Sequence, residues 1–322
     1  MKYVEYINKL IKDEVLRADR MVIFGQNINA GSCLSGLTKN LKVKKGNLII
    51  NTPNCENSLV GIGFGAMMNG VSAAFMMKQQ DFLLLGIDQL VNTYNIIRQR
   101  SAGEGSFTIM TIIVDNGYEG PQSRLNHFGD FCSIAGIQGF TITNTADAKE
   151  IISSQFNAPG FRIIGISQRL FKQEIMEMNV LSVSPDRSVF QYAQGKQATI
   201  ICFNLSLPYG VVMAGRLKEK GLSASLFSVN SPVPVNWDEL VHDINKTGTL
   251  ILIDDLKSRN LASDNLLVKV LGHCTLKQKF IIRRRPEENV FSPHHDQMVI
   301  DYDHIVGQLA TEWQGGLKSA EI

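Results

Sequence analysis

One carboxylate stands alone among glycines, methionines and aliphatic side chains in the stretch NTPNCENSLVGIGFGAMMNG, residues 51–70. This residue, Glu56, comes where a helix is expected to begin, over 56–70. A carboxylate in a first turn gains roughly 0.3–1 kcal/mol from the helix dipole, and that gain alone would be reason enough for it. The helix after it, however, is too apolar and small-sided for a surface element, so we expect it to be buried against another helix or a subunit. A carboxylate buried there needs a partner, which makes Glu56 the first candidate for chemistry.

Other motifs carry less information. GIGFGA (61–66) has the glycines of a dinucleotide fingerprint, but its spacing is GxGxG and no strand runs into it. We therefore expect Gly61, Gly65 and Ala66 to allow close packing. The six histidines include no HxxxH or HExxH pair, and the chain contains no GxSxG and no P-loop. No metal site is expected in this chain.

The elements that must position Glu56 alternate between apolar strands and helices. Nearly continuous apolar runs are typical of parallel strands that are buried on both faces. With 322 residues, 44% of them hydrophobic, the sequence predicts an α/β fold of two parallel-sheet domains, at 1–185 and 190–322, joined by a linker within 179–197. Strands are expected at 21–28, 47–52, 107–115, 139–143, 161–167, 198–204, 223–230, 248–255 and 279–284. Helices are expected at the N-terminus and at 56–70, 80–99, 121–135, 145–156, 208–220, 236–246 and 261–272.

Charge and cysteine content exclude several classes of function. The net charge of +2 gives no field strong enough to indicate a nucleic-acid or membrane-surface partner, and the basic clusters at 39–46 and 281–288 are short. The five cysteines are scattered and form no CxxC pair, as expected of reduced thiols. No run of 18 apolar residues suggests a membrane span. We expect a cytoplasmic protein.

The stretch TPNCENSLVGIGFGAMMNGVSAAFMMKQQDFLLLGIDQLVN resembles the pyrimidine-binding domain of thiamine-diphosphate enzymes. It is most similar to the β subunit of pyruvate dehydrogenase-type 2-oxo acid dehydrogenases, and more distantly resembles the C-terminal half of transketolase. RADRMVIFGQNI, NTADAKEII, KTGTLILIDD and FSPHHDQMVIDYDHIV are similar to further parts of the family, so the resemblance spans nearly the whole chain. It implies a pyrimidine-binding domain followed by a transketolase C-terminal-like domain.

The resemblance also implies roles for individual residues. Glu56 would hydrogen-bond the pyrimidine nitrogen of thiamine diphosphate, so that the neighbouring amine can take the thiazolium proton, and Phe82 would stack on the pyrimidine ring. Gln26 and Asn27 occupy the place of a familiar acidic pair beside the cofactor. An aromatic ring is suited to hold a flat heterocycle.

Half of the cofactor site is missing from this chain. The family holds the diphosphate through a metal on a GDG motif followed by NN, and no GDG occurs here. The resemblance therefore implies an α-type partner subunit that carries GDG…NN and Mg²⁺, with thiamine diphosphate shared across the interface of an α₂β₂ assembly that includes a β–β contact.

The loop GPQSRLNHF (120–128) departs from the family, because its histidine falls on Ser123. Ser123, Arg124 or His127 would have to take its place. We therefore expect a 2-oxo acid decarboxylase that transfers an acyl or ketol unit to an acceptor, with a carbonyl compound as a candidate acceptor in place of lipoamide. The alternatives are the C-terminal half of a split transketolase and a non-catalytic β-like partner.

Overall fold

The computed structural model describes residues 1–99, 105–117, 120, 126–233, 235–284 and 298–319, with the main chain alone at Glu312 and 314–319. Its internal contacts divide the chain into two units. Met1–Met178 form the bulk of the first unit. Asn179–Asn230 and most of the chain after residue 235 form the second.

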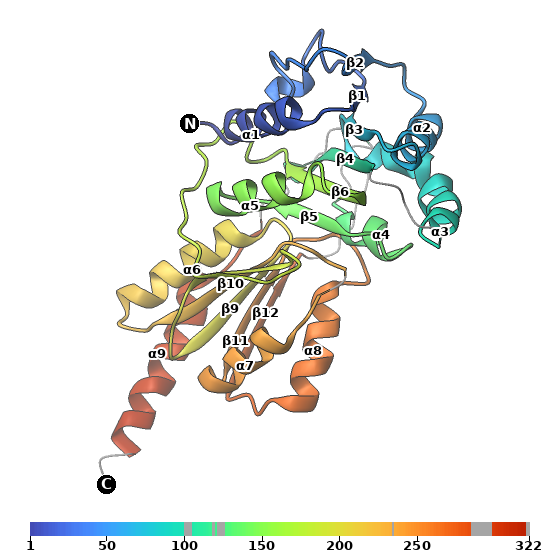
Figure 1. Ribbon diagram of the computed structural model, residues 1–322. Coiled ribbons are helices and arrows are strands. Elements are labelled where there is room, and N and C mark those ends of the chain that lie inside the picture. Colours follow the sequence, from blue (N-terminus) through green and yellow to red (C-terminus); the bar gives the residue numbers. More distant parts are fainter. Residues whose placement is uncertain (100–104, 118–119, 121–125, 234, 285–297, 320–322) are drawn as a thin grey trace. The chain divides into compact units, whose positions relative to one another are not determined.

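The first unit is built on a six-stranded sheet in which every strand pair is parallel (Figure 1). Two of its inner strands, β4 and β6, are almost wholly buried, as the continuous apolar runs predict. In spatial order the strands are β2 (Leu48–Asn51), β1 (Met21–Gly25), β3 (Ser72–Met77), β4 (Ser106–Ile113), β6 (Gly160–Ser167) and β5 (Gly139–Ile142).

Helices α1 (Tyr3–Arg17), α2 (Glu56–Met68), α4 (Phe128–Ser133) and α5 (Thr145–Gln155) connect or cover these strands. A short 3₁₀ helix, η1 (Leu34–Gly36), follows β1. Helix α5 begins with a capping box in which the Asn144 side chain accepts from the amides of Ala146 and Asp147, and the Asp147 side chain reaches back. The expected helix over 121–135 is described only from residue 126, and its helical part is α4.

The single helix expected over 80–99 is wrong. The segment divides into a 3₁₀ helix, η2 (Gln80–Gly86), a π-helical turn, η3 (Gln89–Thr93), and the short α3 (Tyr94–Ile97). Gly86, the last residue of η2, lies close to α2: a methyl group added there would lie 2.9 Å from Cγ2 of Val60.

The second unit contains a six-stranded mixed sheet (Figure 1). Four strands are parallel, as expected, but β8 is antiparallel to β10 and β7 to β8. The linker expected within 179–197 is therefore wrong: its residues form an antiparallel edge, in which Val189–Ala193 pair with β10 and four consecutive residues are buried. The spatial order is β12 (Gln278–Arg283), β11 (Thr249–Asp254), β9 (Ala198–Phe203), β10 (Ala224–Val229), β8 (Val189–Ala193) and β7 (Ser182–Val183).

Helices cover both faces of the second sheet. The residues of α7 (Asp238–Thr247) and α8 (Ala262–His273) pack with Ile201, Phe203, Phe227 and Val229. Helix α6 (Leu207–Glu219) lies on the other face, where a methyl group at Gly210 would meet Sγ of Cys202 at 2.1 Å. The C-terminal α9 (Tyr302–Ser319) packs against α6.

Candidate functional site

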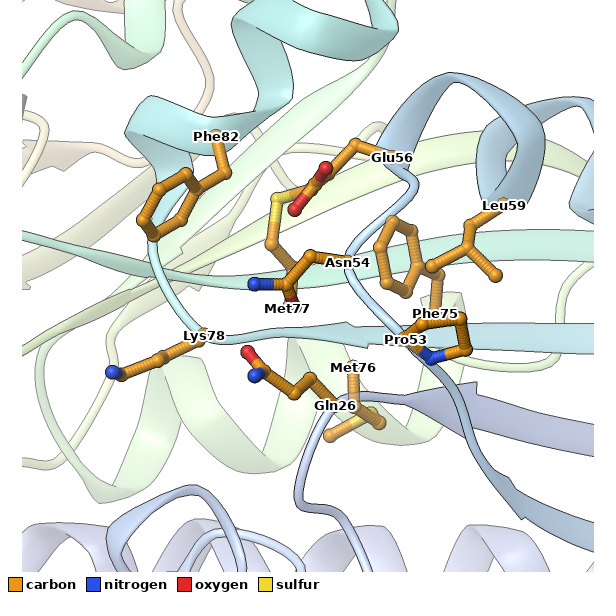
Figure 2. Close-up of a pocket in the computed structure, with 10 residues that line it drawn as sticks. All are labelled: Gln26, Pro53, Asn54, Glu56, Leu59, Phe75, Met76, Met77, Lys78 and Phe82. Atoms are coloured by element: carbon orange, nitrogen blue, oxygen red, sulfur yellow. The ribbon is translucent and has the colours of Figure 1, made fainter.

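A pocket that is open to solvent, with about 280 Å³ of empty space once that open solvent is counted, lies where β1 and β3 end. From β1 the chain continues to β2 on one side, whereas from β3 it continues to β4 on the other. The cavity therefore occupies a topological switch point at the carboxyl ends of parallel strands, the usual place for ligands in such sheets. Gln26 follows β1, Lys78 follows β3, Asn54 and Glu56 come from the start of α2, and Phe82 comes from η2 (Figure 2).

Glu56 is the first residue of α2, as the sequence predicts. It is only 8% exposed, and its carboxylate points into the cavity (Figure 2). No hydrogen bond or ion pair from the described residues satisfies that carboxylate. The helix N-terminus favours the negative charge, but a nearly buried carboxylate without a donor needs a ligand that brings one.

Phe82 lies across the cavity from Glu56 on η2 (Figure 2). Its ring is half-buried and belongs to no aromatic pair among the described residues. The spacing of the two elements is set by Gly86, whose missing side chain lets η2 approach the Glu56 carbonyl and Val60. Behind Glu56, Gln89 donates to Oδ1 of Asn57 at 3.0 Å and joins η3 to α2. A flat ring can therefore enter between a carboxylate and an open aromatic face.

Of the residues expected beside the cofactor, Gln26 lines the cavity and Asn27 does not. Asn27 is exposed and has a left-handed backbone with φ of 54°, and its carbonyl accepts from the amide of Leu34 at 3.2 Å. The turn after β1 thus directs successive side chains to different places, with Gln26 toward Glu56.

Of the candidates in the loop 120–128, the structure describes only His127. Ser123 and Arg124 lie outside the described residues. His127 directly precedes α4, and its Nδ1 lies 3.2 Å from Oδ2 of Asp130. It is absent from the residues that line the cavity. A role for Ser123 or His127 in the reaction stays a prediction.

Sequence reasoning missed Asn54 and Lys78. Lys78 is the only cation among the described residues that line the cavity, and Asn54 adds an amide two residues before Glu56. Lys78 carried a usable signal, since it is the first charge after the apolar run of β3 and so lies at the carboxyl end of a buried parallel strand. Phe75, stacked on Phe24 with ring centroids 5.4 Å apart, forms part of the cavity wall.

The glycines of GIGFGA allow close packing, but not at every position where the sequence predicts it. Gly63 is the close contact, because a methyl group there would lie 2.2 Å from the Phe107 ring on β4. A methyl group at Gly65 would meet nothing within 4 Å, and Ile62 and Met68 on the same helix are 56% and 46% exposed. Within this chain, α2 thus buries one face on the sheet and leaves an uncharged face open.

The residues at the cavity fit the pyrimidine part of thiamine diphosphate, since they offer a partnerless carboxylate and an open aromatic face. They do not supply the rest of its site. Among the described residues, no group of three His, Cys, Asp or Glu side chains could hold a metal ion. Within the same residues, no helix combines the length and apolar character required to cross a membrane.

Comparisons with known proteins show which proteins the chain resembles. No family model matches the chain. It is 24% identical over 293 residues to the 2-oxoisovalerate dehydrogenase subunit beta of Bacillus subtilis (strain 168), covering 88% of each protein. It is 26% identical over 259 residues to the pyruvate dehydrogenase E1 component subunit beta of Mesostigma viride, covering 78% of each.

Among solved structures, the chain matches a split gene transketolase, described as an inactive beta4 tetramer, with a TM-score of 0.68. The match covers 95% of this chain and 97% of the other. At 13% identity it shows similarity of the fold alone. The α/β fold predicted from the sequence is confirmed. So is the resemblance: the chain is similar in sequence to β subunits of 2-oxo acid dehydrogenases, and its fold is similar to that of a split transketolase.

Proposed function

We propose that this chain is the β-type subunit of a two-component thiamine-diphosphate enzyme. The complex decarboxylates a 2-oxo acid and transfers the acyl or ketol unit to an acceptor. The names of the relatives support the substrate class. The single observation that carries the proposal is the Glu56 carboxylate, which is nearly buried, has no partner in the described part of the chain and faces Phe82 across the cavity.

Thiamine diphosphate supplies a nucleophilic carbon once its thiazolium has lost a proton. Glu56 holds a proton between its carboxylate and the pyrimidine ring nitrogen, and its burial keeps water from competing for that hydrogen bond. Phe82 packs against the flat ring and orients it. Gln26 and Asn54 present amides to the same space.

The proposal requires an α-type partner that brings the GDG…NN motif, Mg²⁺ and the diphosphate site. The open face of α2 supports a subunit contact: Glu56 is the only charged residue of the helix, and Ile62 and Met68 are exposed on it. An α₂β₂ heterotetramer with a β–β contact would cover apolar surface of this kind. The isolated chain is expected to be inactive, as the split transketolase is in its beta4 tetramer.

The acceptor is proposed to be a carbonyl compound instead of lipoamide, because a serine, Ser123, replaces the histidine expected in the loop. A hydroxyl cannot serve as a cationic donor at neutral pH. The second candidate function is the C-terminal half of a split transketolase, which the structural match favours at the level of the fold.

The test is co-purification of this chain with the protein from an adjacent reading frame that carries GDG and NN, followed by a screen of 2-oxo acids with thiamine diphosphate and Mg²⁺. We expect carbon dioxide release from the complex and none from either chain alone. A complex that leaves every 2-oxo acid intact but cleaves a ketose phosphate would replace the proposal by the split transketolase.

A further inference from the structure

The Lys78 ammonium has no evident task within the chain. It is exposed at the carboxyl end of β3, and no hydrogen bond or ion pair from the described residues holds it. The other described residues that line the cavity are neutral or apolar, apart from Glu56. A free cation beside a ligand cavity is available to an anionic group of the ligand.

Two amides extend into the same part of the cavity. Figure 2 shows the amides of Gln26 and Asn54 on the Lys78 side of the cavity, away from Leu59, with the ammonium of Lys78 extending outward from them. Each amide offers N–H donors, and Lys78 offers a mobile ammonium. Three donors from three separate segments, the ends of β1 and β3 and the start of α2, can surround a carboxylate or another oxyanion.

The anionic group that these donors would bind is not the carboxylate that leaves as carbon dioxide. When C1 departs as carbon dioxide, the bonding electron pair stays on the neighbouring carbon and the carboxylate loses its charge. An ammonium paired with that carboxylate would stabilise the ground state more than the transition state and slow the reaction. A cation serves better when it holds a second anionic group that keeps its charge throughout.

We infer that Lys78 is a specificity-determining residue that selects 2-oxo acids with a second anionic group at their far end. Gln26 and Asn54 donate to the same group. This inference rests on the proposed function and narrows its substrate class to dianionic 2-oxo acids.

The test measures kcat/KM of the complex with its α-type partner for 2-oxoglutarate and for 2-oxopentanoate, which has the same chain length and no second carboxylate. A hydrogen bond to a charged group contributes about 1.5–3 kcal/mol, which corresponds to about 10- to 100-fold in kcat/KM. We expect the unaltered complex to prefer 2-oxoglutarate by at least about 10-fold. Lys78→Met should abolish that preference, mainly through KM for 2-oxoglutarate, and leave 2-oxopentanoate within about twofold.

Two variants serve as controls. Lys78→Arg keeps the charge and should retain most of the preference. Lys45→Met removes an exposed lysine of the same unit outside the cavity and should change neither substrate. A complex that prefers 2-oxopentanoate, or a Lys78→Met variant that slows both acids equally, overturns the inference and leaves the proposed function standing.

A second measurement does not depend on turnover. Glutarate, a dicarboxylate that cannot be decarboxylated, is titrated into the complex by calorimetry. We expect a dissociation constant that rises about 10-fold or more in Lys78→Met and little in Lys45→Met. Equal binding by all three proteins would overturn the inference even if the complex decarboxylates neither of these two 2-oxo acids. The proposed function is refuted separately, by a complex that leaves every 2-oxo acid of the screen intact.

Discussion

At the scale of single residues, the site depends on two side chains that face each other from separate elements. Glu56 supplies a carboxylate without an internal partner, and Phe82 supplies a ring face without an aromatic neighbour in the described part of the chain. Without a ligand, each of these two features is energetically unfavourable for the folded chain. Together they describe a place for a flat, hydrogen-bonding heterocycle.

Phe82→Ala should weaken the binding of thiamine diphosphate to the complex by about 10-fold, because an aromatic stacking contact contributes roughly 0.5–1.5 kcal/mol beyond the area it buries. Phe82→Leu keeps an apolar side chain without a flat ring and should show most of the same loss. The dissociation constant is measured by calorimetry with Mg²⁺ present. Unaltered affinity in both variants would show that the ring does not contact the cofactor.

The sequence was sufficient to predict that Glu56 and Phe82 lie together, as they do at the cavity, because they belong to a stretch that resembles a known family. It was not sufficient for Asn54 and Lys78. Their proximity depends on β1 and β3 being neighbours, with the chain leaving them in opposite directions. That arrangement follows from the crossover topology and not from any local pattern. Asn27 shows the converse, because its left-handed turn takes a side chain adjacent to Gln26 away from the cavity.

At the scale of elements, α2 carries the site and is held on the sheet by one glycine. Gly63 lets the helix approach Phe107 on β4, whereas Gly65 two residues later meets open space. The position of Glu56 at the start of the helix depends on that contact.

Gly63→Ala should destabilise the chain by about 1–3 kcal/mol, because the added methyl group would overlap the Phe107 ring and force α2 outward. Gly65→Ala is the matched control: it should raise stability by up to about 1 kcal/mol through helix propensity. Urea unfolding of the isolated full chain measures both. A Gly63→Ala variant as stable as Gly65→Ala would contradict the packing.

The elements that sequence patterns predicted well carry a clear local signal: α5 has an acid in its first turn, and β4 and β6 are continuous apolar runs. The two failures have physical causes. The segment 80–99 reads as one apolar helix, but its hydrogen bonding changes from 3₁₀ to π to α along the chain, where Gly86 packs closely on Val60. The segment 179–197 has mixed polarity, typical of a linker but also of the antiparallel edge that it forms, in which β7 is partly exposed and β8 is mostly buried.

At the scale of the whole molecule, one buried acid makes stability depend on pH. Burial raises the pKa of Asp254, at the end of β11, from 3.8 to about 6, although Ser263 donates to its Oδ2 at 2.6 Å. Since the folded state then binds more protons than the unfolded state between these two values, stability is highest below about pH 4 for this group. It falls as the pH rises to about 6.

Asp254→Asn should remove this dependence, because the amide stays neutral and can still accept from the amide of Leu256. A shift of about two pKa units corresponds to about 3 kcal/mol, so the variant should gain up to that amount relative to the unaltered chain between pH 4 and pH 7. Urea titrations at both pH values provide the measurement. If the variant and the unaltered chain differ in free energy of unfolding by the same amount at pH 4 and at pH 7, the raised pKa of buried Asp254 is contradicted.

The central claim, that Glu56 holds a proton on the pyrimidine ring of thiamine diphosphate, is tested by the rate of hydrogen–deuterium exchange at the thiazolium carbon in the assembled complex. Glu56→Gln preserves shape but removes the acid, so the complex should assemble normally and bind the cofactor. General acid–base groups contribute about 10²–10⁴-fold, and we expect exchange to slow by at least about 100-fold. Exchange within a few-fold of the unaltered complex, with assembly and binding intact, would contradict the account.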